Sequence, residues 1–386
     1  MTSKIRLPLP RCRKKAVFYT TLMIEVKDLK ETKVNEDFVF NNPSFANHEL
    51  IVFCHDKDTG LKAIIAIHNT TLGPALGGTR MWSYKTDAEA LNDVLRLSRG
   101  MTYKAAISGL QLGGGKAVIF GDSKKDKTPE MFVKYGEFIE ALNGKYITAE
   151  DVGTSLSDMV NIRKATTHVT GLPEEMGGGG DPSPVTAYGV FMGMKAAAKK
   201  RWGIDSLRGK KIVVQGVGHV GENLVRLISE EDAKIFVTDL NKDSLATIAS
   251  KYGAEIIAPE LVYDLDVDIY APCALGATLN SENIPRLKCS VISGAANNQL
   301  ADENIHGRML ADKGILYAPD FLINAGGLIN VFSELKGYNR KDALSRTQHI
   351  YDTTLQIFEK ANQENITTIE AAKKIAEERI LSAKKK

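Results

Sequence analysis

Two lysines and one aspartate in the first half of the chain have the types and spacing for acid–base chemistry beside a carboxylate. Lys104 and Lys116 lie 12 residues apart, and Asp151 ends a strand-like segment. Two ammonium groups and a carboxylate could bind a carboxylate substrate and move a proton next to it. Neighbouring ammonium groups and burial both lower a lysine pKa. A lysine whose pKa approaches neutrality can act as a general acid or base.

Lys116 has an unusual sequence context. It follows three glycines in LQLGGGKAVIF, residues 110–120, and an apolar, β-prone run follows it. This order predicts a glycine turn that feeds a buried strand. Lys116 is then either a solvated lysine beside a tight turn or a catalytic ammonium in a glycine-walled pocket. The stretch taken alone favours the solvated lysine, so the choice depends on the rest of the chain.

A second candidate site is a GxGxxG motif that follows the strand-like run KKIVVQ and opens a helix. The first glycine permits a tight turn, the second lets the backbone approach a pyrophosphate, and the third lets the helix pack close to the strand. The helix N-terminus offers N–H groups and partial positive charge to phosphates. We expect His219, inside the motif, to line the phosphate loop. The expected cofactor-binding residues are the motif and the residue after it: Gly216, Val217, Gly218, His219, Val220, Gly221 and Glu222.

Asp239 ends the next predicted strand, 18 residues after Gly221. Its carboxylate can accept hydrogen bonds from the adenosine ribose hydroxyls and would repel a 2′-phosphate, which favours NAD over NADP. The alternative is a turn aspartate that caps the following helix.

The elements around these residues change character along the chain. Residues 48–68 predict two strands joined by a turn, and later runs predict a helix, a strand, a helix over 129–142 and another strand. The run of four glycines at 177–180, within 174–190, is either a hinge that leads into a long helix, with Ser183 as its N-cap, or a plain flexible loop. From residue 210 strands and helices alternate, which predicts a doubly wound parallel sheet.

The predicted fold class is therefore α/β with two domains and a cleft between them. We expect a basic leader, disordered, over residues 1–22 and a substrate-binding, catalytic α/β domain over 23–178. An NAD-binding Rossmann domain is expected over 179–364. The C-terminal helix, within 365–386, is expected to pack back on the first domain.

Composition excludes several classes of protein. The chain has 386 residues and a net charge of +3, but the leader holds six basic residues and no acid, which leaves −3 for the body. An acidic body argues against nucleic-acid binding. No run approaches the roughly 18 apolar residues of a membrane span. The leader lacks the apolar core of a secretion signal, and a start at Met23 is an alternative to a transit-like segment.

Cysteine and histidine spacing argues against a metal site. The four cysteines lie far apart without a CxxC pair, which favours reduced thiols and a cytoplasmic location. The seven histidines form no HExxH motif, so we expect no metal.

The chain resembles the amino-acid dehydrogenase family that includes the glutamate, leucine, phenylalanine and valine enzymes. The resemblance covers roughly residues 45–380, and LGGGK is its most specific short motif. It favours the catalytic interpretation of Lys116. The stretches that carry it are GPALGGTRMW, GMTYKAAISGLQLGGGKAVI, YITAEDVGT, GVGHVG, SGAANNQL and APDFLINAGGLINV.

The resemblance implies a role for each candidate residue. Lys104 would bind the substrate α-carboxylate, and Lys116 would activate the water that attacks the imino carbon. Asp151 would exchange protons with the amine and the water. Gly77 and Gly78 would let the backbone approach the substrate closely. Thr186 would lie near the nicotinamide, and Asn297 would lie near both the substrate and the nicotinamide.

The implied reaction is the reversible oxidative deamination of a branched-chain amino acid, leucine above all, with NAD. Glutamate-specific relatives carry a lysine directly before the GG pair, where this chain has Leu76, and a carboxylate facing a buried leucine loses several kcal/mol of solvation. An apolar pocket suits leucine, valine or isoleucine, and phenylalanine only if the pocket is deeper; ordinary core packing is the alternative for each residue. The expected pocket residues are Leu76, Ala149, Leu328 and Val331.

Other functions remain open at this point. A 2-hydroxy-acid dehydrogenase would need a His–carboxylate pair and a carboxylate-binding arginine, and no convincing set is present. A catalytically inactive NAD-binding sensor or scaffold would have a broken lysine–lysine–aspartate set, yet all three residues are present. The expected partners are an amino acid or 2-oxo acid, ammonium, and further copies of the chain, since relatives form homo-oligomers, often octamers; neither nucleic acid nor a membrane is expected.

Overall fold

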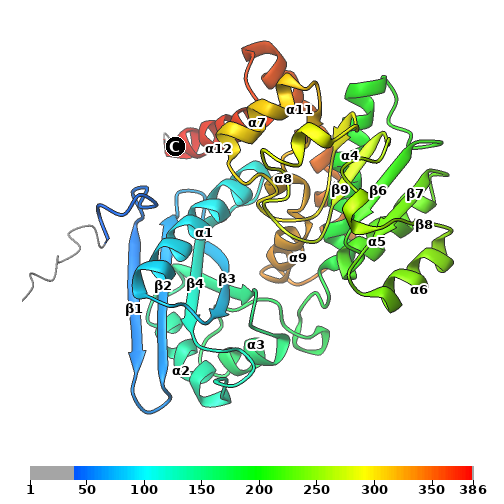
Figure 1. Cartoon of the computed structure of the whole chain (residues 1–386). Coiled ribbons are helices and arrows are strands. Elements are labelled where there is room, and N and C mark those ends of the chain that lie inside the picture. The colour runs from blue at the N-terminus through cyan, green and yellow to red at the C-terminus, as the bar shows by residue number, and fades with distance from the viewer. Residues whose placement is uncertain (1–38, 385–386) are drawn as a thin grey trace, which may run out of the picture.

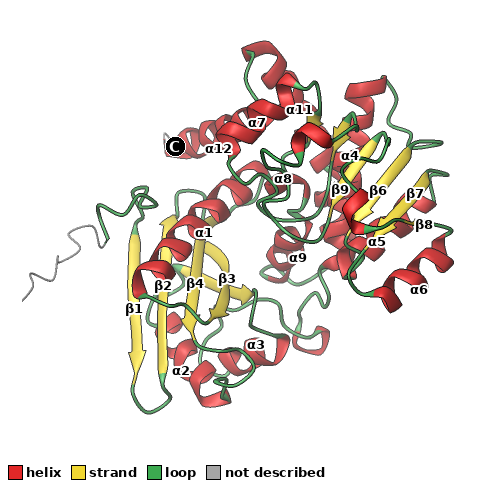
Figure 2. Ribbon diagram, in the orientation of Figure 1, coloured by secondary structure: helices red, strands yellow, loops and turns green. Residues whose placement is uncertain are grey.

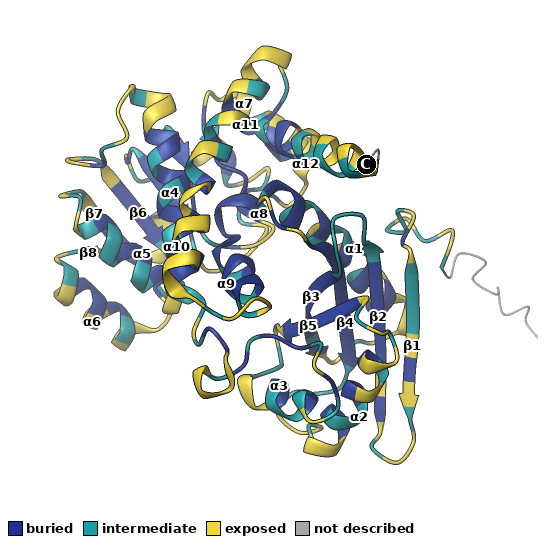
Figure 3. Ribbon diagram, turned by 180° about the vertical axis from the view of Figure 1, so that it is seen from behind, coloured by how far each residue is buried: buried dark blue, intermediate teal, exposed yellow. Residues whose placement is uncertain are grey.

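The computed structural model describes residues 39–384, so the predicted leader and Met23 lie outside the described residues. Two α/β domains are built on separate sheets (Figure 1). Figure 2 shows the strands of each sheet flanked by helices, and Figure 3 shows that the inner strands of both sheets are buried.

The N-terminal domain contains a five-stranded mixed sheet in the order β1-β2-β4-β3-β5. The strands β1 and β2 form the predicted hairpin and are antiparallel, β2 and β4 are antiparallel, and β3 is parallel to both β4 and β5. The helix α1 covers one face, while α2 and α3 cover the other. The bounds are β1 Leu50–Asp56, β2 Leu61–Asn69, β3 Ala75–Trp82, α1 Asp87–Ile107, β4 Gly113–Phe120, α2 Pro129–Glu140, β5 Tyr146–Glu150 and α3 Leu156–Arg163.

The sequence of α1 explains its position. The Thr86 hydroxyl caps the helix by accepting a hydrogen bond from the backbone N–H of Glu89. Four residues at helical spacing are buried on one face of α1. They are Leu91, Val94, Leu95 and Ser98.

The prediction of a glycine turn before Lys116 is wrong. Gly113, Gly114 and Gly115 are the first three residues of β4, and none has a positive φ. They are needed because neighbouring atoms come too close for a side chain. A Cβ on Gly114 would overlap the backbone nitrogen of Thr102, and one on Gly115 would lie 2.8 Å from the ring of Tyr146. The glycines therefore let α1 and β5 approach the strand that carries Lys116.

The segment between the domains is packed against both of them. Thr170 is tied to β5, since its N–H and hydroxyl both donate to the Thr148 carbonyl. The carboxylate of Glu334 accepts from the N–H of Gly171 at 2.8 Å and from that of Gly179 at 2.9 Å. The 3-10 helix η1, Glu174–Met176, lies between these two glycines. The glycine run is thus anchored at Gly179 rather than free.

The helix α4, Ser183–Trp202, begins one residue earlier than predicted. Pro182 is its N-cap residue, so the prediction of Ser183 as the cap is wrong. The Ser183 N–H instead donates to Asp181 Oδ1 at 2.9 Å.

The C-terminal domain contains a six-stranded sheet in the order β8-β7-β6-β9-β10-β11, and every pair is parallel. Counted from β6, this is the strand order 3-2-1-4-5-6 of the doubly wound dinucleotide-binding fold. The strand bounds are β6 Lys211–Gln215, β7 Lys234–Thr238, β8 Glu255–Ile256, β9 Ile269–Pro272, β10 Val291–Ile292 and β11 Leu316–Tyr317. The remaining helices are α5 His219–Ser229, α6 Lys242–Tyr252, η2 Pro259–Leu261, η3 Ile284–Arg286, α7 Glu303–Asp312, α8 Asp320–Ile323, α9 Gly326–Glu334, α10 Arg340–Gln348, α11 Ile350–Glu364 and α12 Thr368–Lys384.

The last helix bridges the two domains. It packs against α11 and against α1 of the N-terminal domain. The Arg379 guanidinium donates to the carbonyls of Ala106 at 2.5 Å and Leu110 at 2.8 Å, at the C-terminal end of α1. The Tyr103 hydroxyl donates to Glu377 at 2.8 Å.

Candidate active site

Lys116 and Asp151 form a buried ion pair in the N-terminal domain. The Lys116 Nζ lies 3.1 Å from Asp151 Oδ1. Lys116 lies on β4, an inner strand, and only 6% of the residue is exposed, whereas Asp151 directly follows β5. The structure therefore does not place Lys116 in bulk solvent.

The surroundings of Lys116 lower its pKa. Burial is the main cause and lowers its pKa, and the positive charge of Arg80 acts in the same direction. The negative charge of Asp151 opposes them without cancelling them. A lysine whose pKa is lowered gives up its proton more readily than a solvated lysine, which suits it to acid–base chemistry.

Asp151 remains an anion in this environment. Burial alone would raise its pKa, but the positive charges of Lys116 and Arg80 outweigh burial and lower it. Arg80 Nε donates to Asp151 Oδ2 at 2.9 Å, so each carboxylate oxygen has its own cationic partner.

Lys104 connects the two domains. It lies in the last turn of α1, and its Nζ donates to Asn324 Oδ1 at 2.7 Å, at the end of α8. The amide of Asn324 in turn donates to Asn297 Oδ1 at 2.8 Å. Burial lowers the pKa of Lys104 to about 8, helped by the charge of Lys116, while the carboxylate of Asp320 opposes the shift.

The paired glycines of β3 lie beside this cluster. Gly77 and Gly78 are buried and pair with β5, with Gly78 opposite Ala149. A Cβ on Gly78 would lie 2.9 Å from the Asp151 Cβ. The carbonyl of Gly77 accepts a hydrogen bond from the Tyr146 hydroxyl at 2.6 Å.

The predicted apolar residues come from both domains. Leu76 on β3 and Leu328 on α9 belong to one hydrophobic cluster, and Val331 packs against it. Ala149 is buried on β5, two residues before Asp151. The residue directly before the paired glycines is Leu76, whose uncharged side chain is fully buried.

The GxGxxG loop has the geometry expected for pyrophosphate binding. Gly216 has a φ of 98°, and a Cβ on Gly221 would overlap the carbonyl oxygen of Gly216. Gly218, at the start of α5, has open space beside it. Asp239 follows β7 and accepts from the N–H of Val217 at 2.7 Å, so its carboxylate borders the loop.

The other predicted cofactor residues are near this loop or at the start of α4. His219 is exposed and lies 3.6 Å from Asp181, and Glu222 pairs with Lys251 at 3.0 Å. The Thr186 hydroxyl donates to the Pro182 carbonyl at 3.0 Å. Val220 packs against the hydrophobic cluster under α5.

Sequence reasoning missed four residues of this site. Asn324 and Asp320 contact or face Lys104, while Arg80 and Asp93 extend the cluster beyond Asp151. Arg80 and Asn324 lie inside the stretches GPALGGTRMW and APDFLINAGGLINV, so the signal was the presence of charged or amide side chains in otherwise apolar runs. Asp93 had no such signal, because its partner comes from another element.

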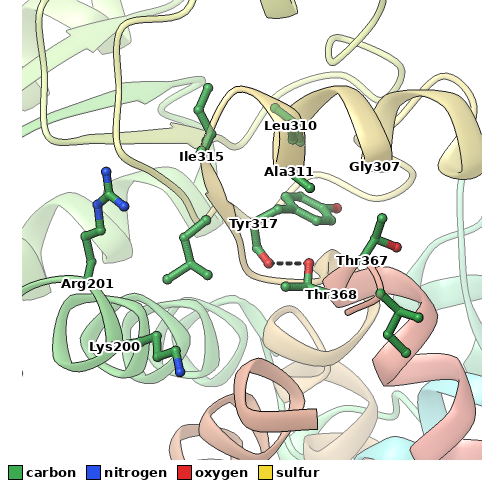
Figure 4. Close-up of a pocket in the computed structure, with 12 residues that line it drawn as sticks. Lys200, Arg201, Gly307, Leu310, Ala311, Ile315, Tyr317, Thr367 and Thr368 are labelled. Atoms are coloured by element: carbon green, nitrogen blue, oxygen red, sulfur yellow. Dashed lines mark hydrogen bonds between the residues drawn. The ribbon is translucent and has the colours of Figure 1, made fainter. Parts of the chain in front are cut away.

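Two cavities lie outside the Lys116–Asp151 pair itself. One of about 450 Å³ is lined by Arg80, Asp93 and their neighbours. The other, of about 280 Å³, lies between α4, α7, β11 and the start of α12, and contains none of the predicted site residues (Figure 4). Tyr317, at its base, accepts a hydrogen bond at its carbonyl from the Thr368 hydroxyl at 2.8 Å.

Residues 39–384 contain neither a cluster of metal-ligating side chains nor a membrane-spanning helix. No group of three or more His, Cys, Asp or Glu side chains in this range is arranged to hold a metal ion. None of the helices within it has both the length and the apolar character needed to cross a bilayer.

The chain matches two sequence families over most of its length. Residues 48–168 match the Glu/Leu/Phe/Val dehydrogenase dimerisation domain. Residues 177–239 and 237–386 match the Glutamate/Leucine/Phenylalanine/Valine dehydrogenase family.

Several known proteins are similar over most of the chain. A leucine dehydrogenase of Thermoactinomyces intermedius is 55% identical over 342 residues, which cover 89% of this chain and 93% of that protein. A leucine dehydrogenase of Bacillus cereus is 55% identical over 88% of this chain and 92% of its own length. The crystal structure of L-tryptophan dehydrogenase from Nostoc punctiforme is 48% identical, with a TM-score of 0.80, and the match covers 88% of this chain and 98% of that one.

Proposed function

Because the chain belongs to the Glu/Leu/Phe/Val dehydrogenase family, we propose that it catalyses the reversible oxidative deamination of branched-chain L-amino acids with NAD. L-leucine is the principal substrate, and valine and isoleucine are further ones. Leucine, NAD+ and water give 4-methyl-2-oxopentanoate, NADH, ammonium and a proton. The buried Lys116–Asp151 pair, with Lys104 beside it, is the observation that carries this proposal.

The substrate is held first by its α-carboxylate. Lys104 supplies the cation for this contact, and Asn324 holds the Lys104 ammonium in place at 2.7 Å. A carboxylate and an ammonium form a charge-assisted hydrogen bond, which is shorter and stronger than a neutral one. The backbone of Gly77 and Gly78 allows the α-carbon to come close to β3.

Asp151 and Lys116 then move the protons. Asp151, as an anion, takes a proton from the α-ammonium, because only the neutral amine can support loss of hydride from the α-carbon. The bound nicotinamide supplies the hydride acceptor. Neutral Lys116 takes a proton from water as its oxygen attacks the imino carbon. Asp151 returns its proton to the amine nitrogen, and it takes the proton of the carbinolamine hydroxyl as the C–N bond breaks, the C=O bond forms and ammonia leaves. Release of the two protons from Lys116 and Asp151 then gives ammonium and one free proton.

The fit of the cofactor site supports NAD. Residues 216–221 have the glycine geometry that a pyrophosphate needs, at the start of α5. Asp239 places a carboxylate after β7 where the ribose hydroxyls would lie, and this charge would repel the 2′-phosphate of NADP. Thr186 and Asn297 are assigned to the nicotinamide end.

The apolar pocket supports a branched aliphatic side chain. Leu76, Ala149, Leu328 and Val331 offer no charge to a substrate side chain, and several kcal/mol would be lost by desolvating the γ-carboxylate of glutamate there. One methylene changes discrimination by only about 1–3 kcal/mol, so valine and isoleucine are also accepted. The leucine dehydrogenases at 55% identity support this ranking over the tryptophan enzyme at 48%.

Assembly and location follow the same proposal. The match of residues 48–168 to a dimerisation domain supports a homo-oligomer, and we propose an octamer, which light scattering on the purified protein would test. Cys54, Cys273 and Cys289 are free thiols, which supports a cytoplasmic location.

The decisive test is replacement of Lys116. We expect K116A to lose about 10²–10⁴-fold in kcat, the range that general acid–base catalysis supplies, while its affinity for NADH stays unchanged. NADH formation should be followed over leucine, valine, isoleucine, phenylalanine and glutamate, and NADH consumption with and without ammonium. Substantial turnover by K116A, or reduction of the 2-oxo acid without ammonium, would contradict the proposal.

A further inference from the structure

We infer that Arg80 is a positioning residue for the proposed reaction: braced by Asp93, its guanidinium orients the Asp151 carboxylate toward Lys116 and sets the pH range in which the pair works. This inference rests on the proposed function of Lys116 and Asp151. It adds to that function two residues that touch neither the substrate nor the cofactor.

The first observation is a line of alternating charges. Lys116 lies 3.1 Å from Asp151 Oδ1, and Asp151 Oδ2 accepts from Arg80 Nε at 2.9 Å. The other end of the guanidinium, Nη1, donates to Asp93 Oδ2, also at 2.9 Å. The four residues come from β4, the end of β5, β3 and α1, so the line crosses the sheet and reaches the helix above it.

Asp93 is itself fixed on its far side. Its Oδ2 also accepts from the Tyr84 hydroxyl at 2.8 Å, and its Oδ1 accepts from Arg96 Nη2 at 3.0 Å. Arg80 is therefore held between two carboxylates and cannot turn without losing one of them. A lysine at this position would keep the charge but could not present two separate nitrogens to the two acids in the same geometry.

The backbone of Asp151 is attached to the same strand as Arg80. The Asp151 N–H donates to Thr154 Oγ1 at 2.9 Å, and this hydroxyl donates to the Thr79 carbonyl at 2.9 Å. The Met81 N–H donates to the Val152 carbonyl at 2.9 Å. With its backbone fixed on β3, the remaining freedom of Asp151 is rotation of its carboxylate, and Arg80 removes that freedom.

The electrostatics give the two new residues opposite effects. The positive charge of Arg80 lowers the pKa of both Lys116 and Asp151, whereas the negative charge of Asp93 raises the pKa of Lys116. Burial raises the pKa of the nearby tyrosines, so their hydroxyls stay neutral. The charged and titratable groups around Asp151 are Lys116, Arg80, Asp93, Lys104, Tyr84 and Tyr146.

The test compares the pH dependence of kcat for leucine deamination in three variants. In R80Q we expect the acidic limb to move to higher pH by about one unit or more, since loss of a neighbouring cation raises the pKa of both Lys116 and Asp151. In D93N we expect the limb to move to lower pH, because an anion is lost. In R80K the limb stays within about 0.3 units of the wild type while kcat falls, since the charge is kept and the bridging geometry is lost.

A matched control is the Lys127–Asp158 pair, which is similarly buried and lies in the same domain, between the loop before α2 and α3. K127Q should leave the pH profile unchanged. Shifts of R80Q and D93N in the same direction, or no shift in R80Q, would overturn the inference, because general structural damage does not change sign with the charge removed.

A second readout does not depend on turnover. The pKa of Lys116 can be measured by competitive trace labelling of lysines over a pH series, followed by mass spectrometry. It should rise in R80Q and fall in D93N, and an unchanged value in both would refute the role of Arg80. A wild-type protein that fails to turn over any amino acid would instead refute the proposed function, and the labelling result would still decide the role of Arg80.

Discussion

At the scale of single residues, Lys104 joins protonation to substrate binding. Its ammonium is bonded to Asn324 of the other domain, and burial lowers its pKa to about 8. The free site therefore holds a cation below that pH and loses it above. A bound carboxylate favours the cation and raises the pKa again, so binding above pH 8 must take up a proton.

This proton uptake predicts how pH changes the affinity of the NADH-loaded enzyme for the 2-oxo acid when ammonium is absent. The affinity for 4-methyl-2-oxopentanoate should be constant below about pH 7.5 and fall up to tenfold per pH unit above 8, which follows from the pKa of about 8. Calorimetry in two buffers of different ionisation enthalpy should show proton uptake near pH 8.5.

The matched variant is K104R, whose guanidinium stays charged. Its affinity should be lower than that of the wild type but should not change between pH 7 and 9. A wild-type affinity that is flat to pH 10 would show that Lys104 is not the group that binds the carboxylate.

The single residues also show what a sequence can predict. Lys104, Lys116 and Asp151 were predicted because their types are rare in apolar runs and their motifs are specific. Arg80 and Asp93 escaped, because an arginine on a strand and an aspartate on a helix are ordinary surface residues until the fold brings them together. Pairing across elements is a property of tertiary packing, and no local pattern encodes it.

At the scale of elements, β4 depends on residues without side chains. The strand alternation and the helix spacing were predicted correctly because they follow hydrophobic period. The sequence wrongly predicts a turn at the three glycines, because glycine serves both positive φ and close approach and the sequence does not distinguish these two uses. In β4 it is close approach that matters, since α1 lies against Gly114.

At the scale of elements, two glycine-to-alanine substitutions should change the free energy of unfolding in opposite directions. G114A should reduce the free energy of unfolding by about 1–3 kcal/mol or more, the usual cost of overpacking, because its Cβ would overlap Thr102. Gly100 lies on α1, the helix that contains Thr102, and a Cβ added there has no atom within 4 Å. G100A should increase stability by about 0.5–1 kcal/mol, since alanine favours helix.

Urea denaturation of both variants would measure these changes. Equal effects of the two substitutions would mean that backbone flexibility, rather than contact with α1, determines the tolerance of β4.

At the scale of the whole molecule, α12 joins the end of the chain to the helix that carries Lys104. The last carbonyls of any α-helix lack partners within the helix. At the end of α1 the Arg379 guanidinium donates at 2.5 Å to the Ala106 carbonyl, which also accepts from the Gly109 N–H, and at 2.8 Å to the carbonyl of Leu110, three residues past the helix. The position of Lys104 thus depends on a residue about 270 positions later in the sequence.

Replacement of Arg379 should therefore affect both stability and binding. R379A should lose about 1.5–3 kcal/mol of unfolding free energy, the usual value of hydrogen bonds to a charged group, and should raise the KM for leucine. E378Q, on the same helix, removes only an exposed pair with Lys360 and should change stability by less than about 0.5 kcal/mol. A stable R379A with an unchanged KM would mean that α12 does not position Lys104.

The change of partner between Thr170 and Gly171 has a mechanical consequence. Thr170 is bonded to the Thr148 carbonyl of the N-terminal sheet, while Gly171, with a φ of 74°, is bonded to Glu334 of the C-terminal domain. Adjacent residues are therefore attached to bodies that would rotate against each other. Leu172 packs again in the core of the N-terminal domain, so the backbone torsions at Gly171 would take up only part of such a rotation. A residue with a side chain at 171 would narrow the range of those torsions and hence the arc through which the active site could open.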